Sequence, residues 1–316
     1  MKRAVAAAML CLLLSGCGRG GDSAASGGLL GRAAGLDESE TLLVIDGREI
    51  PAWQYLYWLA ADCQQLEARC EAAETPLDWA APLPDGGTYG ELVKADALAD
   101  TALYATVQTW AETYGCTLTA EERAALPERT YPFLTAEQGR VLTETGQAYV
   151  KLYALYQEPD SPLAPAEGEL ELFQRESGLL PTERILIPSN GDRTAAQQQA
   201  AALFARLNAA ADPSAEFDAL LKETGGGVLA DEDWTDDLRD AASALEPGQI
   251  SGLLETEEGV SILRRLPADS AAVKEAYFDQ QLQDAARHSE IQWTDACAAL
   301  NSETFWNAVK RGESID

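Results

Sequence analysis

The chain has 316 residues, 46% of them hydrophobic, which is enough to bury one or two cores without a disulfide or a metal as support. Its 52 Asp and Glu residues outnumber its 23 Lys and Arg residues, so the formal net charge is −29. Because like charges repel, this balance argues against nucleic acid and anionic lipid headgroups as partners. The acidic residues are spread along the chain, which is typical of solvated helix faces, and a site for basic partners stays open.

Residues 1–17 are predicted to be a lipoprotein signal peptide. A positively charged start is followed by an apolar run from Ala4 to Leu14, which is too short to span a bilayer. The run ends in Leu-Ser-Gly-Cys17, which resembles the lipobox of bacterial lipoproteins. That resemblance implies that Cys17 is acylated, becomes the first residue after cleavage, and anchors the protein on the extracytoplasmic side of the membrane of a bacterial cell envelope. An ordinary secretory signal with an incidental cysteine is the alternative.

Residues 18–40 are rich in Gly, Ser and Ala and are predicted to be a flexible tether. The apolar run from Thr41 to Ile45 then predicts a strand, and Asp46-Gly47 a tight turn. Pro51 is placed near the start of a helix, where its missing N–H has no cost. The apolar residues that follow at helical spacing are Trp53, Leu56, Tyr57, Ala60 and Cys63.

Two long amphipathic helices are predicted next, at about 88–114 and 136–156, because apolar residues recur there at helical spacing. Between them, Thr119 and Glu122 have the spacing of a capping box. The aromatic residues of the second helix are interpreted as helix-on-helix packing, with a client-binding stripe as the alternative. The run at 158–165, which contains three prolines, marks a break in the chain.

A second module follows, at 177–267. The alternating run Glu183 to Ile187 predicts a strand, and residues 250–254 and 260–266 predict two more. Between them, helix starts are predicted at Thr194, with Gln197 completing a capping box, at Asp212-Pro213 and at Thr235. Residues 270–300 are predicted to be helical, with Phe305 and Trp306 in a last turn or short helix.

The segments ERILI, FDALLKETGGG, ALEPGQIS and GVSILRRL of this module resemble the parvulin family of peptidyl-prolyl isomerases. The resemblance implies a small antiparallel sheet flanked by helices and a pocket that binds proline-containing peptides. It also implies that Arg184 and Ser261 occupy the positions of two family histidines, and that Trp234 and Leu238 form the apolar floor. The family's Asp or Cys lies in a polar segment between the second helix and the glycine loop, and that segment is missing here, where KETGGG runs directly into the loop.

These departures imply isomerase activity that is weak or lost. The plainer interpretation of the same residues is a core or surface-anchoring aromatic at Trp234, a solvated strand residue at Arg184 and an inert hydroxyl at Ser261.

The strand, turn and aromatic helix from residue 41 resemble the opening of exported foldases of the SurA and PrsA type. This resemblance implies an α+β chain: a mainly helical chaperone-like domain at 41–176, completed by a C-terminal helical segment at 268–316, with the parvulin-like module inserted. It further implies a membrane-anchored foldase that binds unfolded or proline-containing secreted polypeptides. An active isomerase with a rearranged pocket, and a non-catalytic interaction or solute-binding lipoprotein, are the alternatives.

The sequence predicts no cofactor and no metal site. Its one histidine, His288, lies on a predicted helix, and no HExxH, GxSxG, GxxxxGK[ST] or paired CxxC motif is present. Cys63 and Cys70 would lie about 10.5 Å apart along a helix, which is too far for a disulfide. A disulfide between Cys116 and Cys297 is left open.

Overall fold

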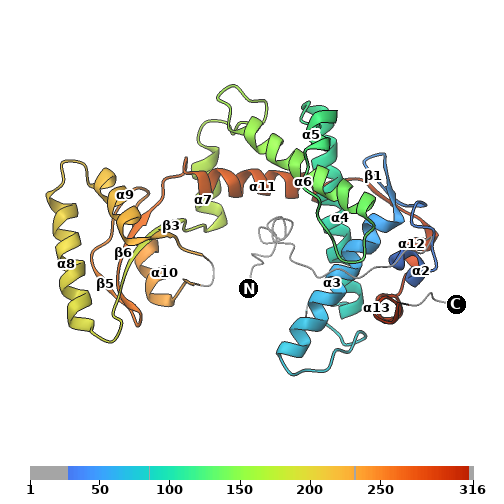
Figure 1. Cartoon of the computed structure of the whole chain (residues 1–316), viewed down its shortest axis with the longest axis horizontal. Helices are drawn as coiled ribbons and strands as arrows, with labels where there is room; N and C mark the ends of the chain where they lie inside the picture. Colours follow the sequence, from blue (N-terminus) through green and yellow to red (C-terminus); the bar gives the residue numbers. More distant parts are fainter. Residues whose placement is uncertain (1–27, 85, 231–232, 313–316) are drawn as a thin grey trace. The chain divides into compact units, whose positions relative to one another are not determined.

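The computed structural model of the chain describes residues 28–84, 86–230 and 233–312; the predicted signal peptide with Cys17 lies outside them. Within these ranges the chain is α+β, with many helices and two small antiparallel sheets, which confirms the predicted fold class. It divides into two compact units (Figure 1). Unit 1 consists of Met1–Ala164 and Phe278–Asp316, and unit 2 is Pro165–Tyr277, so the predicted boundaries at 177 and 267 fall inside unit 2.

Unit 1 is a group of helices beside a three-stranded antiparallel sheet. Its sheet has the order β2-β1-β7, and Leu43 of β1 faces Trp293 of β7. The strand β7 therefore joins the C-terminal part of the chain to its N-terminal part. The elements are α2 (Leu29–Ala34), β1 (Thr41–Ile45), β2 (Arg48–Pro51), α3 (Ala52–Ala72), α4 (Tyr89–Thr113), α5 (Ala120–Ala124), α6 (Ala136–Tyr156), β7 (Ile291–Trp293), α12 (Asp295–Ala299) and α13 (Ser302–Arg311).

The helix α3 contributes most to the core of unit 1. Tyr55, Leu56 and Leu59 are fully buried, together with Leu30 of α2 and Phe305 of α13. Burying a side chain of this size contributes about 1.5–3 kcal/mol. The two ends of the described chain thus help to form the same core.

The prediction of a flexible tether over 18–40 is wrong for Leu29–Ala34, which is the helix α2. Leu30 and Ala33 are spaced one turn apart, so one face of this short helix is buried against the core of unit 1. Gly35 ends the helix in the left-handed conformation, at φ 67°. The many small residues in 18–40 suggested a linker. The few apolar residues between them instead hold this segment in a helix against the core.

The prediction of continuous helix over 270–300 is also wrong. The helix α11 (Ala271–Arg287) ends before His288, and Ile291–Trp293 is the strand β7. A segment of three residues has no periodicity to read, and it becomes a strand because β1 offers it unpaired backbone groups. His288 is an exposed turn residue at the end of α11.

Most of the predicted helix starts are confirmed. Thr119 forms a capping box with Glu122, Asp212 caps the helix that begins at Pro213, and Thr235 accepts a hydrogen bond from the backbone N–H of Leu238. The capping box predicted at Thr194 is wrong. Asp192 caps that helix instead, because its carboxylate accepts from the N–H of Ala195.

The aromatic residues of α6 pack against Phe278 of α11, which is fully buried. The ring centroids of Tyr149, Tyr153 and Tyr156 lie 5.6, 5.5 and 5.1 Å from that of Phe278. These are ordinary distances for aromatic pairs in a protein core. The stripe that the sequence offered as a client-binding surface is therefore engaged in helix packing at these positions.

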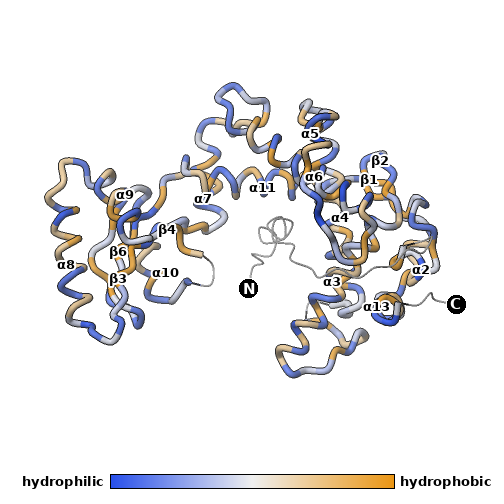
Figure 2. The backbone as a smooth tube through the Cα atoms, viewed as in Figure 1, coloured by the Kyte–Doolittle hydropathy of each residue, from blue (hydrophilic) through white to orange (hydrophobic). Residues whose placement is uncertain are grey.

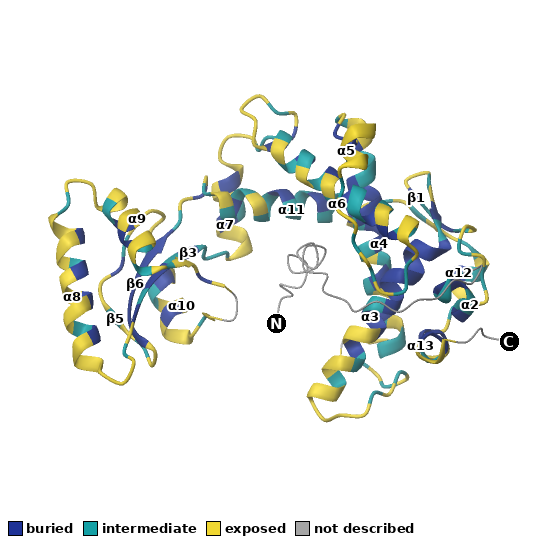
Figure 3. Cartoon of the chain, viewed as in Figure 1, coloured by how far each residue is buried: buried dark blue, intermediate teal, exposed yellow. Residues whose placement is uncertain are grey.

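Unit 2 is built on a four-stranded antiparallel sheet of order β4-β3-β6-β5. Three hydrophobic residues follow one another in β3, at 185–187, and β6 is buried over its whole length (Figures 2 and 3). Of the strand predicted at 250–254, only its end forms β5, and the strand β4 was not predicted. The elements are α7 (Glu169–Ser177), β3 (Thr182–Pro188), α8 (Arg193–Ala209), α9 (Pro213–Thr224), β4 (Gly227–Val228), α10 (Asp236–Ser243), β5 (Leu254–Glu255) and β6 (Gly259–Arg265), followed by the start of α11.

Neither a spanning helix nor a disulfide is found in the described part of the chain. No helix within it is both long and apolar enough to cross a membrane. Cys63, Cys70, Cys116 and Cys297 are free thiols, so the disulfide left open between the last two is not formed. Burial raises the pKa of Cys297 to about 12, which keeps this thiol protonated and unreactive.

Candidate peptide-binding face of unit 2

The two central strands of unit 2 present different residues to their two faces. Side chains alternate along a strand, so Arg184 and Leu186 of β3 share a face with Ser261 and Leu263 of β6. The helix α10 contributes to this face, because Leu238 and Ala242 form a buried cluster with Leu263. We call it the α10 face. The residues predicted as the family's pocket positions all come from it or from the segment just before α10.

On the α10 face, Arg184 binds Ser261 directly. The guanidinium Nε donates a hydrogen bond to Ser261 Oγ at 2.9 Å, and Nη2 lies 2.6 Å from Glu258 Oε2. Ser261 is fully buried and Arg184 is 9% exposed, whereas the Glu258 side chain is 61% exposed. The two positions that the sequence singled out are thus brought together, and they form one polar cluster with an acid at its outer edge.

Trp234 and Leu238 lie at the apolar part of the same face. Leu238 is 1% exposed and belongs to the buried cluster with Leu263, so it packs beneath the face. Trp234 is only partly buried against that cluster, and the Arg239 guanidinium lies 5.3 Å from its ring centroid. Of the two apolar candidates, Trp234 is the one with surface to offer a ligand.

Two glycines give this face its backbone shape. A Cβ on Gly226 would come within 2.5 Å of the Arg184 carbonyl oxygen, and one on Gly259 within 2.0 Å of the Ile187 carbonyl oxygen. Only glycine permits such close approach of two backbone segments. The glycines that follow α9 can therefore lie against β3, where Gly227 pairs with Arg184.

The opposite face of the sheet is closed. Ile185, Ile187 and Ile262 pack there against α8 and α9. Arg264 on this face is held by Glu183 and by Asp218, and its guanidinium lies 4.5 Å from the Phe217 ring centroid. These contacts are structural, because every one of them is made to the neighbouring helices or strand.

The chemistry of the α10 face is hydrogen-bond donation beside apolar surface. A guanidinium stays protonated and cannot accept a hydrogen bond, so Arg184 serves as a donor and not as a base. Its partner Ser261 is buried and already accepts from it. Sequence reasoning missed Glu258, whose role depends on the turn between β5 and β6 that brings it to Arg184.

Comparison with known proteins gives similarity at the level of solved structures. No protein-family model matches the sequence, and no curated protein matches it either. Among solved structures, PrsA from Bacillus subtilis is 10% identical, with 87% of this chain and 92% of that one covered and a TM-score of 0.23. A SurA-like chaperone of Campylobacter jejuni is 12% identical over 80% and 99% of the two chains, with a TM-score of 0.24. The PrsA peptidylprolyl isomerase of Bacillus cereus is 11% identical over 88% and 100%, with a TM-score of 0.20.

Proposed function

We propose that this protein is a lipid-anchored, extracytoplasmic foldase or chaperone that captures unfolded or proline-containing segments of secreted proteins. Its isomerase activity is weak or lost. The signal-like N-terminal residues and Cys17 support the anchor, and the lipid on Cys17 would hold the two units where exported chains emerge.

The observation that carries the proposal is the combination of apolar surface and paired polar side chains on the α10 face. Trp234 offers apolar surface where the peptide is expected to bind, while the expected polar positions hold the cluster of Arg184, Ser261 and Glu258. Rotation about an X-Pro bond is slow, so catalysis needs placed polar groups around a twisted bond in a dry site. Here Arg184 and Ser261 are already bound to each other, and Arg184 also to Glu258, so we expect binding to be retained better than catalysis.

One protein preparation tests both halves of the proposal. The full chain is assayed for acceleration of proline isomerisation in a protease-coupled peptide assay, and for suppression of aggregation of a reduced, unfolded client. We expect clear suppression at equimolar chaperone and little or no acceleration. Trp234→Ala should weaken the suppression, and Val150→Ala, at an exposed position of unit 1, serves as the control. Absence of suppression with a single defined partner in a pull-down would favour the interaction-lipoprotein alternative.

The active-isomerase alternative has one observation in its favour. The Arg184 guanidinium has five N–H donors, and the bonds to Ser261 and Glu258 engage only part of them. A remaining donor could hold the carbonyl oxygen of a bound peptide. Under this alternative the full chain accelerates isomerisation, and both Arg184→Gln and Trp234→Ala abolish the acceleration.

A further inference from the structure

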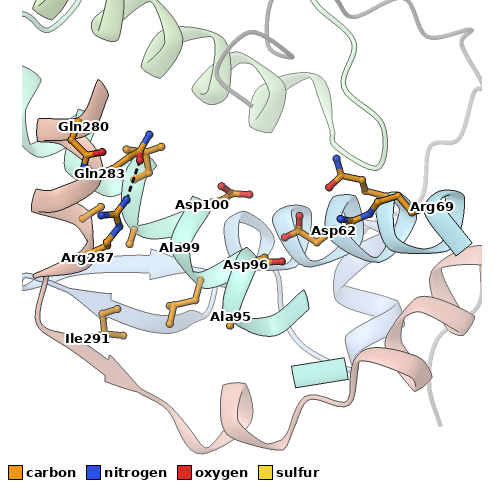
Figure 4. A pocket seen from close by; sticks show the side chains of 15 residues that line it. Asp62, Arg69, Ala95, Asp96, Ala99, Asp100, Gln280, Gln283, Arg287 and Ile291 are labelled. Atoms are coloured by element: carbon orange, nitrogen blue, oxygen red, sulfur yellow. Dashed lines mark hydrogen bonds between the residues drawn. The ribbon is translucent and has the colours of Figure 1, made fainter. Parts of the chain in front are cut away.

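Unit 1 contains a cavity of about 490 Å³ that none of the preceding roles uses. Residues of α3, α4, the end of α11 and β7 line it, and the volume falls in the range of small-molecule sites. Figure 4 shows Asp62 of α3 facing Asp96 and Asp100 of α4. The cavity is thus walled by three acidic side chains from two helices.

One oxygen of each of two of these carboxylates is buried and has no hydrogen-bond partner in the described part of the chain. Asp62 is 3% exposed, and its Oδ2 has no hydrogen-bond partner in the described part of the chain. Asp100 Oδ2 is likewise buried and has none. A buried carboxylate without a partner is costly, because it loses its hydration and gains nothing in return. Two of them in one cavity are an arrangement that a cationic ligand would stabilise.

The cavity's own basic residues do not provide that cation. Arg287 is turned to its own helix, where it donates to Asp284 at 2.7 Å. It also donates to Gln283 at 3.1 Å (Figure 4). Arg69 is exposed, and although its charge lowers the pKa of Asp62, that carboxylate still has an unpartnered oxygen. The pKa of Asp62 is raised overall to about 8, first by burial and then by Asp100 and Asp96.

The rest of the lining indicates the shape of the ligand. Apolar side chains contribute much of the wall, namely Ala95, Leu98, Ala99, Ala102, Leu103, Ala286 and Ile291. No group of His, Cys, Asp and Glu residues in the described ranges has the arrangement of a metal site. A bare metal ion would also leave the apolar wall unused. An ammonium group on an aliphatic chain uses both parts of the cavity.

We propose that this cavity binds a primary alkylammonium group, with Asp62 and Asp100 receiving the charge and the alanine and leucine side chains of α4 the alkyl chain. Lysine side chains of an unfolded polypeptide and free diamines share this chemistry. The site lies within unit 1, so the test of this proposal is independent of the proposed activity of the α10 face in unit 2.

Isothermal titration calorimetry of the full chain tests the site at low ionic strength. The probes are cadaverine, an N-terminally acetylated peptide with one lysine among Ala and Gly residues, and the same peptide with that lysine acetylated as well. We expect cadaverine to bind and the acetylated peptide not to bind. Binding of the lysine peptide would assign the ligand to polypeptides, and its failure beside cadaverine binding would assign it to free amines. No binding by either amine, or equal binding of the acetylated peptide, would overturn the proposal.

Variants locate the binding. Asp62→Asn keeps the side-chain shape and should weaken cadaverine binding about tenfold or more. This is the change in affinity expected from losing roughly one charge-assisted hydrogen bond. Glu128→Gln removes the same charge at an exposed position outside the cavity and should leave the affinity unchanged. Arg69→Gln should strengthen binding, because it removes a competing cation. Equal affinities of the Asp62 and Glu128 variants would contradict this site.

The affinity should also rise between pH 6 and pH 9. The pKa values of Asp62 and Asp100 are raised to about 8 and about 7, so bound cations must displace protons at the lower pH. The charged groups that line the cavity with them are Asp96 of α4, Arg69 of α3 and Arg287 of α11. In the Asp62→Asn variant the rise of cadaverine affinity with pH should be reduced. A general change in the fold would lower the affinity at every pH and would not reduce this rise alone.

Discussion

Asp62 and Asp100 make the stability of unit 1 depend on pH. Burial is the largest cause of their raised pKa values, with Asp100 and Asp96 adding to the shift of Asp62 and Asp96 to that of Asp100. In an unfolded chain such carboxyls titrate near pH 4, so at higher pH the folded state binds more protons than the unfolded state. The folded state is therefore favoured most below about pH 4, where both carboxyls are protonated. This stabilisation is lost as the pH rises through their folded-state pKa values of about 7 and about 8.

Asp62→Asn should therefore stabilise the chain, and more so at alkaline pH. We expect the variant's unfolding free energy to exceed that of the unchanged chain by a margin that grows between pH 4 and pH 8.5. The growth should be more than about 1 kcal/mol, which corresponds to a pKa shift of one unit. Urea unfolding at the two pH values measures it. Glu128→Gln, at an exposed carboxyl, should show no such growth. An advantage of Asp62→Asn that is the same at both pH values would contradict the burial argument.

At the scale of elements, the start of β6 depends on a residue without a side chain. Gly259 has φ 157°, and a Cβ there would lie 2.0 Å from the Ile187 carbonyl oxygen of β3. The long pairing of β3 with β6, from Thr182↔Arg265 to Pro188↔Gly259, ends at this point. The same pairing aligns Arg184 and Ser261, so the α10 face depends on it.

Gly259→Ala should destabilise unit 2 by about 1–3 kcal/mol, because the strained backbone and the close contact cannot both be relieved. Gly252→Ala is the matched control, since a Cβ at Gly252 meets nothing within 4 Å. Hydrogen exchange followed by mass spectrometry should show faster exchange in β3 and β6 for the first variant alone. Unchanged exchange in Gly259→Ala would refute this role of the glycine.

At the scale of the whole molecule, the two units have separate cores. Phe305 of α13 lies in the core of unit 1 with Leu30, whereas Phe217 and Leu238 lie in two of the apolar clusters of unit 2. Phe305→Ala should cost about 3–5 kcal/mol of unfolding free energy. Hydrogen exchange should rise throughout unit 1 and not in unit 2, and Val150→Ala, at an exposed position, should change neither. A uniform rise in both units would show that they unfold together.

The anchor is a prediction for the whole chain in its cell. Cys17→Ser removes the thiol that lipidation requires, so the protein should lose labelling by a palmitate analogue and leave the membrane fraction. Gly35→Ala, which lies after the predicted signal peptide, is the control. It should change neither the palmitate labelling nor the membrane association, even if it alters the helix α2. Membrane association that survives Cys17→Ser would refute the lipid anchor.

How much the sequence predicted depended on how local each signal is. Asp212-Pro213 and Thr235 start helices through hydrogen bonds to residues two or three positions away, so they could be read directly. The alternation in β3 likewise placed Arg184 and Ile185 on opposite faces. Asp192 in place of Thr194 as a cap was missed because both residues suit that role, and only the turn geometry chooses between them.

The sequence by itself determined the fold class, the long helices and the central strands of unit 2, and a family resemblance singled out Arg184 and Ser261. Only the tertiary structure decided that Glu258 completes their cluster, that β7 pairs with β1, and that Asp62 and Asp100 share one cavity. The physical reason is that periodicity and capping act within a few residues along the chain. Strand pairing and the burial of a charge depend instead on which distant segments fold against each other.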